Sequence, residues 1–368
     1  MILVPSLQGG GAEKVATELL PYLSRKFNVI LVLVESKWQY CCDTLAGKRI
    51  ILSPRLRGTW QHIIMIPFHI GSLAFWIKAT GTKAVLSFME QANIINLICS
   101  FFTRHKAILS QRIMPNMQYQ NKGILGKSII SISRVLYPRG AHIIAVSKEI
   151  KDYVLTTYGI REKNISFVPN PVNLQKLQED AKIPLPAEVR RPYIVHIGRF
   201  KIDHKAQDMV LRVFSRLKSE FNGLNLVFVG DGPDLPKIKS LTGSLGLSDS
   251  VCFVGWQEKV APFLANAELL LFPSRREGWP NVLLEAMACG CPVVAADCAS
   301  GPKEILGNNL YGLLVPVNDS EALYNAANRL LEDRGLASYF RKQGLKRARD
   351  FAIEKVSLKY IKIIEKFC

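Results

Sequence analysis

The stretch 269–291, LLLFPSRREGWPNVLLEAMACGC, joins a short apolar run to a glycine turn and then to a helical pattern. Leu269–Phe272 predicts a buried strand, because the run is short, wholly apolar and followed by Pro and Ser. Pro280 suits the first turn of a helix, since its φ is fixed and it has no N–H to leave unpaired. Apolar residues at helical spacing carry that helix to Gly290: Val282, Leu283, Ala286 and Met287. This order leaves backbone N–H groups and a positive helix end beside the strand's carboxyl end, where a phosphate binds readily.

Two glutamates flank this turn: Glu277 precedes the helix, and Glu285 lies more than one turn inside it. A carboxylate beside a phosphate site is repulsive unless it serves another group, and sugar hydroxyls are suitable hydrogen-bond donors. Each glutamate alone is more often a helix surface residue or an acid favoured by the helix dipole. The case for a sugar site therefore depends on the other motifs.

A length of 368 residues is comfortable for two domains of roughly 150–200 residues each, and 48% hydrophobic residues indicate a globular chain. The cysteines show no CxxC pair and no metal-ligand spacing, so we expect buried thiols in a reducing compartment. They are Cys41, Cys42, Cys99, Cys252, Cys289, Cys291, Cys298 and Cys368. No charged region precedes the short apolar N-terminal stretch, and we expect no signal peptide.

The net formal charge of +18 is unevenly distributed. Residues 51–148 hold 12 Lys and Arg against a single acid, Glu90. Such a block attracts an anionic partner, namely lipid headgroups, a diphosphate or nucleic acid, unless it is merely a solvated basic face. Because no nucleic-acid-binding motif is present, we expect no nucleic acid partner.

An uncharged run of twenty residues, 58–77, GTWQHIIMIPFHIGSLAFWI, is long enough to span a bilayer. It contains two His, Gln, Pro and Gly, and a span here would divide the first domain. We therefore favour a buried helix or one that lies at an interface over a transmembrane helix.

The chain opens as a βαβ unit, with a strand at Ile2–Leu7, glycines at Gly9–Gly11, a helix at Ala12–Leu23 and a strand at Phe27–Val34. Glycines at the first strand–helix turn let a ligand approach the backbone, although their spacing is not the dinucleotide pattern GxGxxG.

Alternation of strands and helices continues along the first half. Arg112 follows a predicted strand directly, at the carboxyl end where open α/β sheets bind ligands. Gly126–Leu136, with Lys127 and Arg134, predicts a basic amphipathic helix that suits a membrane surface. The other predicted elements are strands at Ala84–Phe88, Ala107–Ser110, His142–Val146 and Ile165–Val168, and helices at Ala92–Phe102 and Lys148–Tyr158.

The proline-rich stretch Pro169–Pro192 predicts a linker, after which a second set of βα units begins. Its predicted strands are Tyr193–Gly198, Asn225–Val229, Val251–Val254, Leu269–Phe272 and Pro292–Ala295. We therefore expect two doubly wound α/β domains, 1–172 and 173–352, with a cleft lined by strand carboxyl ends. Residues 353–368 are expected to form a C-terminal helix that packs back toward the N-terminal domain.

Arg199 follows the first strand of the second domain, and Lys205 lies six residues further on. Two fixed cations at a strand's carboxyl end suit a polyanion, above all a diphosphate leaving group whose charge rises as its bond breaks. Alone, such a pair is more often surface charge. The predicted anion-binding helix start in the same domain favours the functional interpretation.

These motifs resemble the retaining glycosyltransferases of family 4, and the resemblance covers essentially the whole chain. It rests on Gly9-Gly10-Gly11-Ala12-Glu13, Gly198-Arg199-Phe200 with Lys205, Val229–Pro233, the spacing Glu277-x7-Glu285 and Ser300–Leu306. The resemblance implies the GT-B fold, with two Rossmann-like domains that face each other across a cleft. Residues 9–29 are most similar to bacterial enzymes that extend undecaprenyl-diphosphate-linked glycans, particularly N-acetylgalactosaminyltransferases.

The resemblance also implies roles for individual residues. Arg199 and Lys205 would hold the nucleotide diphosphate and stabilise it as leaving group, while Glu277 would contact the donor sugar. Glu285 would bind the ribose hydroxyls, and Trp256 would either stack on the base or only pack. Backbone N–H groups would meet the sugar and diphosphate along Gly278, Trp279, Pro280, Asn281 and Val282.

From the first domain, Gly10 and Gly11 would face the donor phosphates. The family often has His near Arg112, and this arginine suggests a contact with an acceptor phosphate instead. No obvious nucleophile for a double displacement is present, so the resemblance implies a front-face mechanism. Because the sequence has no Asp-x-Asp, we expect no metal and no other cofactor.

The sequence thus predicts a retaining glycosyltransferase that moves a sugar, such as N-acetylgalactosamine, from a UDP-sugar to a lipid-linked or surface-glycan acceptor. We expect it to be cytoplasmic and peripheral on the inner face of the membrane. The alternative is a GT-B epimerase or isomerase acting on the nucleotide sugar itself, which would not need the basic first domain. A binding protein that has lost the chemistry is a third hypothesis, disfavoured by the intact Arg199, Lys205, Glu277 and Glu285.

Overall fold

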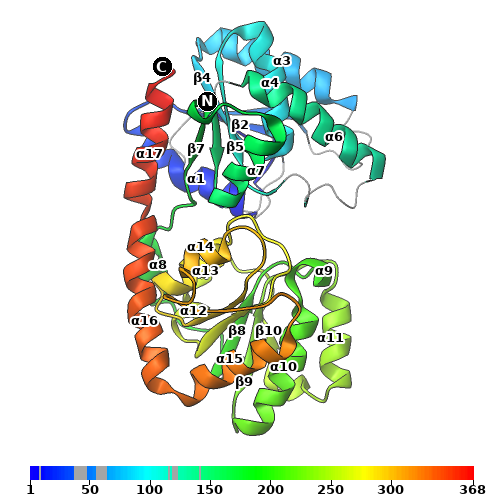
Figure 1. Ribbon diagram of the computed structural model, residues 1–368, viewed down its shortest axis with the longest axis vertical. Coiled ribbons are helices and arrows are strands. Elements are labelled where there is room, and N and C mark those ends of the chain that lie inside the picture. Colours follow the sequence, from blue (N-terminus) through cyan, green and yellow to red (C-terminus); the bar gives the residue numbers. More distant parts are fainter. Residues whose placement is uncertain (8–9, 37–47, 55–63, 115–116, 118–122, 141) are drawn as a thin grey trace. The chain divides into compact units, whose positions relative to one another are not determined.

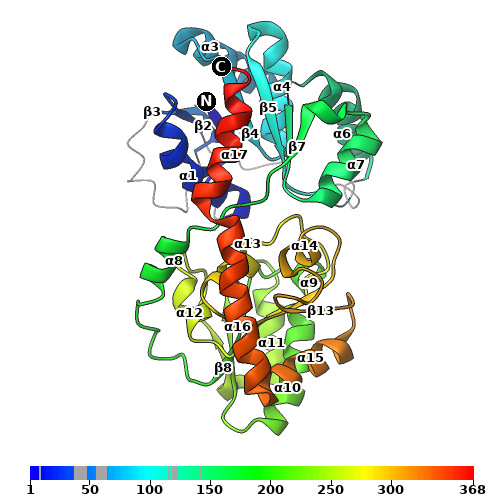
Figure 2. The ribbon, with the colours of Figure 1, turned by 60° about the vertical axis from the view of Figure 1, so that its left-hand side comes forward.

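A computed structural model describes residues 1–7, 10–36, 48–54, 64–114, 117, 123–140 and 142–368 (Figures 1 and 2). The chain forms two compact units. Unit 1 comprises Met1–Pro171 together with Ile353–Cys368, and unit 2 comprises Val172–Ala352. The second domain was predicted at 173–352, and unit 2 begins one residue earlier and ends at the same residue.

Unit 1 contains a parallel sheet of seven strands in the order β3-β2-β1-β4-β5-β6-β7. Each strand is short and mostly buried, as apolar runs in a sheet covered on both faces should be. The strands are β1 Ile2–Val4, β2 Ile30–Glu35, β3 Lys48–Ser53, β4 Ala84–Phe88, β5 Lys106–Gln111, β6 His142–Ala145 and β7 Ile165–Phe167.

Helices cover both faces of this sheet. Residues of α1 and α17 form one apolar core with alternate strand residues, and residues of α3 and α4 form another with the intervening ones. The helices are α1 Gly11–Ser24, α3 Ile66–Thr80, α4 Glu90–Thr103, α6 Gly123–Leu136, α7 Lys148–Tyr158 and α17 Ile353–Glu365, with short 3-10 turns at Tyr137–Arg139 and Glu162–Asn164.

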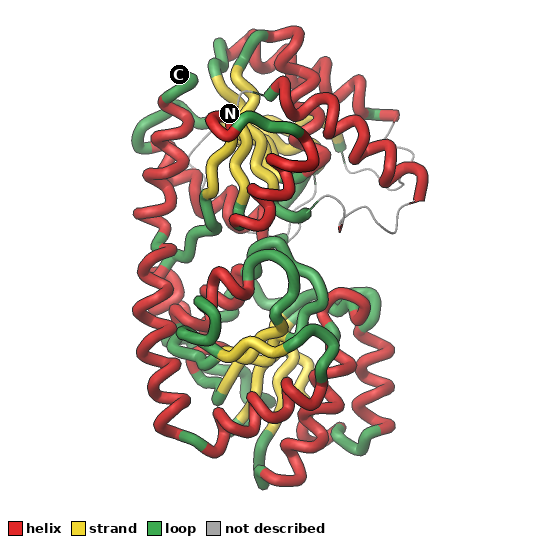
Figure 3. Tube along the Cα trace, viewed as in Figure 1, coloured by secondary structure: helices red, strands yellow, loops and turns green. Residues whose placement is uncertain are grey.

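Unit 2 contains a parallel sheet of six strands in the order β10-β9-β8-β11-β12-β13 (Figure 3). The strands are β8 Tyr193–Ile197, β9 Asn225–Val229, β10 Val251–Phe253, β11 Leu269–Phe272, β12 Val293–Ala296 and β13 Leu313–Val315. Its helices are α8 Leu174–Asp180, α9 Ile202–Lys205, α10 Gln207–Glu220, α11 Leu235–Ser244, α12 Ala261–Ala265, α13 Asn281–Ala288, α14 Pro302–Leu306, α15 Ser320–Glu332 and α16 Arg334–Ala348, with 3-10 turns at Ser248–Ser250 and Arg349–Phe351.

Both units are doubly wound α/β folds, which confirms the predicted fold class. The sequence did not predict β3 or β13, which lie at sheet edges. The stretch Pro169–Pro192 is also more than a linker, because α8 forms within it and packs on α12 and α13.

Two other expectations fall partly outside the described residues. Within the uncharged run, residues 58–63 are not described, and α3 begins at Ile66. No helix in the described part of the chain is long and apolar enough to cross a membrane. Cys41 and Cys42 also lie outside the described residues, while the six described cysteines are free thiols, of which Cys368 is exposed.

Two glycine loops contact each other at the carboxyl edge of the unit 2 sheet. Gly198 N donates to Val229 O, and Phe200 N donates to Asp231 O. Gly230 has a φ of +141°, and a β-carbon there would lie 2.1 Å from the Gly198 carbonyl oxygen. Only glycine fits this approach, which holds the Arg199 loop against the end of β9.

We expect Gly230→Ala to lower the free energy of unfolding by about 2–4 kcal/mol, because the new methyl group meets backbone that cannot move aside. Gly243→Ala is the matched control, since Gly243 lies in α11 with open space around its β-carbon. That control should be neutral or raise stability by up to about 1 kcal/mol. Urea denaturation measures both, and equal stability of the two variants would contradict the prediction.

Candidate active site

The candidate site lies where the strand order of the unit 2 sheet reverses, between β8 and β11. β8 pairs with β9 on one side and with β11 on the other, and all three strands run parallel. The loops that follow β8 and β11 therefore leave the same carboxyl edge at a topological switch point, the usual ligand position in open α/β sheets. Lys205 ends α9, the short helix in the connection after β8, and Glu277 lies in the loop after β11.

Lys205 and Glu277 form an ion pair at this edge. The Lys205 Nζ lies 2.6 Å from Glu277 Oε1, and the two side chains are only 15% and 10% exposed. The Lys205 Nζ also lies 5.0 Å from the centre of the Phe272 ring. Because Gly198 has no side chain, the Lys205 stem passes beside it; a β-carbon there would lie 3.5 Å from Lys205 Cδ. The ammonium group is thus held in one place.

Backbone contacts keep the two loops in register. Arg275 N donates to His204 O at 2.8 Å, and the His204 ring bonds to Arg276 O. The Arg275 guanidinium donates to Ile202 O and, at 2.6 Å, to Asn318 Oδ1. The cation and the carboxylate are therefore positioned by the surrounding fold as well as by their own attraction.

His196, a residue that the sequence reasoning missed, lies in β8 and is fully buried. Its Nδ1 is 2.9 Å from Leu271 O, so the ring joins β8 to β11. Burial, with a smaller contribution from the positive charge of Lys205, lowers the His196 pKa to about 4. The ring is therefore neutral near pH 7 and adds no charge to the site. A His in an all-apolar strand was the available signal.

The predicted strand–turn–helix is present, with β11 followed by the turn and α13. The turn is held from outside, because Ser300 Oγ donates to Gly278 O at 2.7 Å. Gly301 has a φ of +98°, and a β-carbon there would lie 2.8 Å from Pro280 Cδ. The Ser-Gly pair matched the family motif, but nothing local predicted that it supports this turn.

The other predicted donor residues of this region differ in exposure. Trp279 is buried, and its ring packs on Phe351 with 5.5 Å between centroids, so its side chain shapes the turn from beneath. Glu285 is also buried, on α13, whereas Asn281 and Val282 at the start of that helix are half-buried. The helix start is thus the accessible part of this motif.

Arg199 and Trp256 also lie at this carboxyl edge. Arg199 is exposed and, among the described residues, makes no ion pair, while its carbonyl accepts from Gln207 Nε2. Trp256 is half-buried and comes directly after Gly255, whose carbonyl accepts from Gly230 N at 2.7 Å. The edge therefore offers an exposed cation, a cation held in an ion pair, a carboxylate, a helix start and an aromatic ring.

In unit 1, the glycine turn after β1 is organised by a glutamate. Gly10 and Gly11 are exposed, while Gly9 lies outside the described residues. Glu13 is buried; its Oε2 accepts from Gly10 N at 2.6 Å and its Oε1 from Ser6 Oγ at 2.9 Å. A Glu three residues after a helix N-cap is the signal for this arrangement. The Gly10 amide is therefore already used within the chain.

Arg112 follows β5 directly, at the strand end where the sequence placed it. Its side chain is buried, it stacks 5.3 Å from the centre of the Phe88 ring, and the nearby Tyr360 of α17 interacts with it. Burial lowers its pKa. The burial comes from α17, whose Tyr360 interacts with the guanidinium. The contact of Arg112 with an acceptor phosphate stays a prediction.

Two family descriptions match nearly the whole chain, one after the other. Residues 9–176 match Glycosyltransferase Family 4, and residues 178–347 match Glycosyl transferases group 1. The chain belongs to the family 4 glycosyltransferases. The resemblance drawn from its glycine, arginine–lysine and glutamate motifs is thereby confirmed, and the enzyme is a hexosyltransferase by class.

Relatives of this glycosyltransferase act in glycan synthesis. One from Campylobacter jejuni, 27% identical over 367 residues and 98% of both chains, is named N-acetylgalactosamine-N,N'-diacetylbacillosaminyl-diphospho-undecaprenol 4-alpha-N-acetylgalactosaminyltransferase. Another, the lipopolysaccharide 1,6-galactosyltransferase of Salmonella typhimurium, is 30% identical over 192 residues, 51% of this chain and 52% of the relative.

Solved structures establish the GT-B fold of this glycosyltransferase. Anabaena HepE, in complex with UDP and glucose, superposes with a TM-score of 0.80 at 18% identity over all of both chains. Sucrose-phosphate synthase from Thermosynechococcus elongatus superposes with a TM-score of 0.81 at 18% identity over 99% of this chain and 98% of that one.

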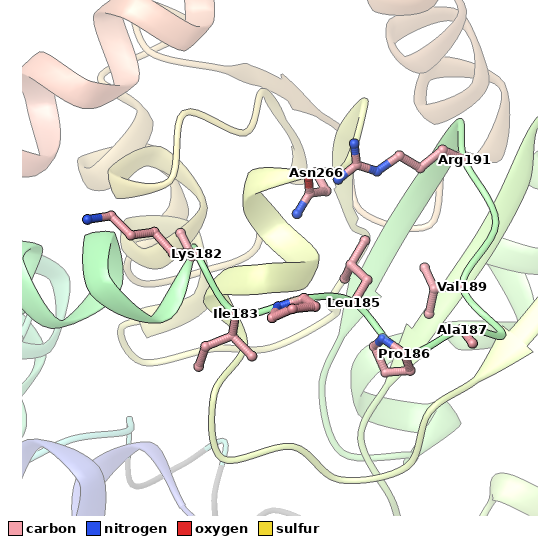
Figure 4. A pocket seen from close by; sticks show the side chains of 10 residues that line it. Lys182, Ile183, Leu185, Pro186, Ala187, Val189, Arg191 and Asn266 are labelled. Carbon is pink, nitrogen blue, oxygen red and sulfur yellow. The ribbon is translucent and has the colours of Figure 1, made fainter.

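A separate pocket of about 460 Å³ lies in unit 2 of the glycosyltransferase (Figure 4). It is formed by Ala181–Ala187, Val189, Arg191 and Asn266, and none of the predicted site residues lines it. This pocket is therefore not the carboxyl-edge site.

A double-mutant cycle tests how the ion pair is held. We expect Lys205→Met and Glu277→Gln each to lower the free energy of unfolding by about 1–3 kcal/mol, because each leaves one charge with little water and no partner. The double variant should lose less than the sum of the two, with a coupling of about 1–2 kcal/mol.

The exposed pair Arg216–Glu321, with side chains 49% and 62% exposed, is the matched control. The cycle made from Arg216→Met and Glu321→Gln should give a coupling below about 1 kcal/mol. Equal couplings for the two pairs, measured by urea denaturation, would show that the fold does not hold Lys205 against Glu277.

Proposed function

We propose that this glycosyltransferase moves a sugar from a UDP-sugar to a lipid-linked or surface-glycan acceptor at the cytoplasmic face of the membrane, with retention of configuration. The observation that carries the proposal is the Lys205–Glu277 pair, 2.6 Å apart at the switch point of unit 2. A cation and a carboxylate at one point suit a substrate that presents a diphosphate next to sugar hydroxyls.

The relatives support the donor and the acceptor. The Campylobacter relative is named for transfer of N-acetylgalactosamine to a diphospho-undecaprenol glycan, and it aligns over 98% of this chain. HepE holds UDP and glucose in the same fold. By this reasoning the donor is a UDP-sugar, with an N-acetylhexosamine such as N-acetylgalactosamine as the favoured sugar.

The side chains of the site are assigned to different parts of the donor. Lys205 and Arg199 neutralise the diphosphate, whose negative charge rises as the glycosidic bond to it breaks. Glu277, already beside Lys205, accepts hydrogen bonds from sugar hydroxyls and so positions the sugar over the leaving group. Glu285 is assigned to the ribose hydroxyls and Trp256 to the base.

Backbone groups complete the proposed donor site. The N–H groups at the start of α13 meet the sugar and diphosphate, and the helix dipole there favours the anion. The contact that the sequence predicts between the donor phosphates and Gly10 and Gly11 stays a prediction. We assign no covalent nucleophile, so the acceptor hydroxyl attacks from the face that the leaving group departs, and the departing phosphate oxygen takes its proton.

The test of the function is a transfer assay with purified protein, a panel of nucleotide sugars and a polyprenyl-diphosphate glycan, run in excess EDTA. We expect one UDP-sugar to be transferred at an unchanged rate, because Lys205, Arg199 and the helix start supply the positive charge that a metal would supply. Activity lost in EDTA and restored by Mg²⁺ or Mn²⁺ would contradict metal independence. A donor that is isomerised without any acceptor would indicate the epimerase alternative.

Glu277→Ala should reduce transfer by at least about 10³-fold, because the sugar loses its main positioning contact while the leaving-group contacts remain. Radiolabelled sugar incorporated into the lipid-linked acceptor is the readout, and circular dichroism confirms the fold. Glu332→Ala, an exposed glutamate at the end of α15, is the matched control and should keep full activity. Full activity in Glu277→Ala would remove this residue from the site.

A further inference from the structure

Unit 1 carries an exposed aromatic surface on α3 and α4. Phe68 and Phe75 of α3 are 54% and 63% exposed, and Phe101 and Phe102 of α4 are 48% and 69% exposed. We call these four residues the aromatic face. No other phenylalanine in the described part of the chain is exposed, so the concentration is specific to this surface.

The aromatic face is not a poorly packed part of the core. The inner side of α3 is already filled, because His69, Leu73 and Ile77 are buried and His69 Nε2 lies 2.9 Å from Ser53 Oγ. Phe68 and Phe75 lie on the outer side, seven residues apart and so two turns apart along one stripe. The two phenylalanines therefore point away from a complete core.

α4 extends the same surface. The two helices pack side by side (Figure 1), and Cys99 Sγ of α4 lies 3.8 Å from Ile70 O of α3. Phe101 and Phe102 lie two and three residues after Cys99, in the last turn of α4. The exposed rings of α3 and α4 thus belong to one helical layer on one face of the sheet.

Four exposed cations border this layer. Lys78 continues the outer stripe of α3, and Arg104 lies two residues after Phe102, at the end of α4. Together with Lys83 and Lys106 they form what we call the basic rim. Lys106 N donates to Lys83 O at 2.9 Å, which brings those two residues together. Glu90, the one acid in residues 51–148, is only 3% exposed, and burial raises its pKa. No carboxylate therefore offsets the rim from within this stretch.

We propose that the aromatic face and the basic rim together bind the surface of an anionic bilayer. The phenylalanine rings enter the interfacial region, while the cations contact headgroup phosphates. A second copy of this chain fits less well, because symmetric association would bring one basic rim against another without an acid to separate them. The proposal rests on the proposed function only in that a lipid-linked acceptor gives the enzyme a reason to reach a membrane.

The sequence pointed to two surfaces, because it favoured a buried or interface-lying helix within 58–77, which contains Phe68 and Phe75, and also a membrane-surface helix at 126–136. The basic amphipathic helix expected at Gly126–Leu136 is part of α6, where Ile132 and Val135 are 47% and 59% exposed. α6 presents aliphatic side chains and no exposed ring, whereas aromatic rings are suited to the interfacial region. The test therefore includes both surfaces.

The experiment is vesicle flotation of the full chain, with vesicles that contain phosphatidylglycerol and with vesicles of phosphatidylcholine alone. Wild type should float with the phosphatidylglycerol vesicles. Phe68→Ser with Phe75→Ser should weaken the partition coefficient at least about tenfold. Lys78→Gln with Arg104→Gln should weaken it about 25-fold, or fivefold per charge, and added salt should remove this difference.

The matched controls lie in unit 2, where Leu310 and Leu345 are exposed apolar residues and Lys342 and Lys346 are exposed cations. Leu310→Ser with Leu345→Ser, and Lys342→Gln with Lys346→Gln, should float like wild type. The proposal is overturned if wild type fails to float, or if the aromatic and rim variants float as well as the controls. It is equally overturned if only Ile132→Ser with Val135→Ser prevents flotation.

Further measurements distinguish membrane binding from a protein–protein interface and from a failure of the proposed function. If wild type is a dimer by mass photometry and Phe68→Ser with Phe75→Ser makes it a monomer that still floats, the face is a protein interface and the proposal fails. Transfer to a short, water-soluble acceptor should be unchanged in that variant. If wild type floats and the variant with Phe68→Ser and Phe75→Ser does not, but wild type shows no transferase activity, then the proposed function is wrong and the membrane-surface proposal stands.

Discussion

The contact between Lys205 and Glu277 depends on the topology of the parallel sheet in unit 2. In a parallel sheet all carboxyl ends share one edge, and only at a switch point do two neighbouring strands send their loops in different directions. β8 and β11 are that pair of strands in unit 2. Lys205 and Glu277 are far apart in the sequence, and they meet there because β8 and β11 are neighbours that end at the same edge.

The surroundings of this contact show how a charged pair is kept in an α/β fold without being fully buried. The glycine loop after β9 presses on Gly198, and the Lys205 stem passes beside that same glycine. Ser300 and Gly301 support the opposite side, at the turn before α13. Because Gly198, Gly230 and Gly301 stand at the close approaches, backbone segments pack directly on one another and fix the shape of the site. The side chains of Lys205 and Glu277 can then face a substrate.

Much of the fold could be predicted because its strands are wholly apolar. Runs such as Leu269–Phe272 and Ala84–Phe88 match the observed elements residue for residue. β3 was missed because its six residues begin with Lys and Arg, which an edge strand tolerates. For the site, the sequence allowed residues to be placed after predicted strands and at a given spacing, as for Lys205 and Glu277. The burial of Arg112 was not predictable, since it depends on Tyr360, a residue in the last helix of the chain.

That last helix has a consequence for how the protein is made. Val356, Tyr360, Ile363 and Ile364 of α17 complete a core with β1 and β4, so unit 1 is assembled from two segments that unit 2 separates in the sequence. On the ribosome, unit 2 is a continuous piece that emerges whole, whereas the first sheet waits with part of one face uncovered until residues 353–368 have emerged. A nascent chain that stops short of residue 353 therefore exposes an apolar surface to chaperones and proteases.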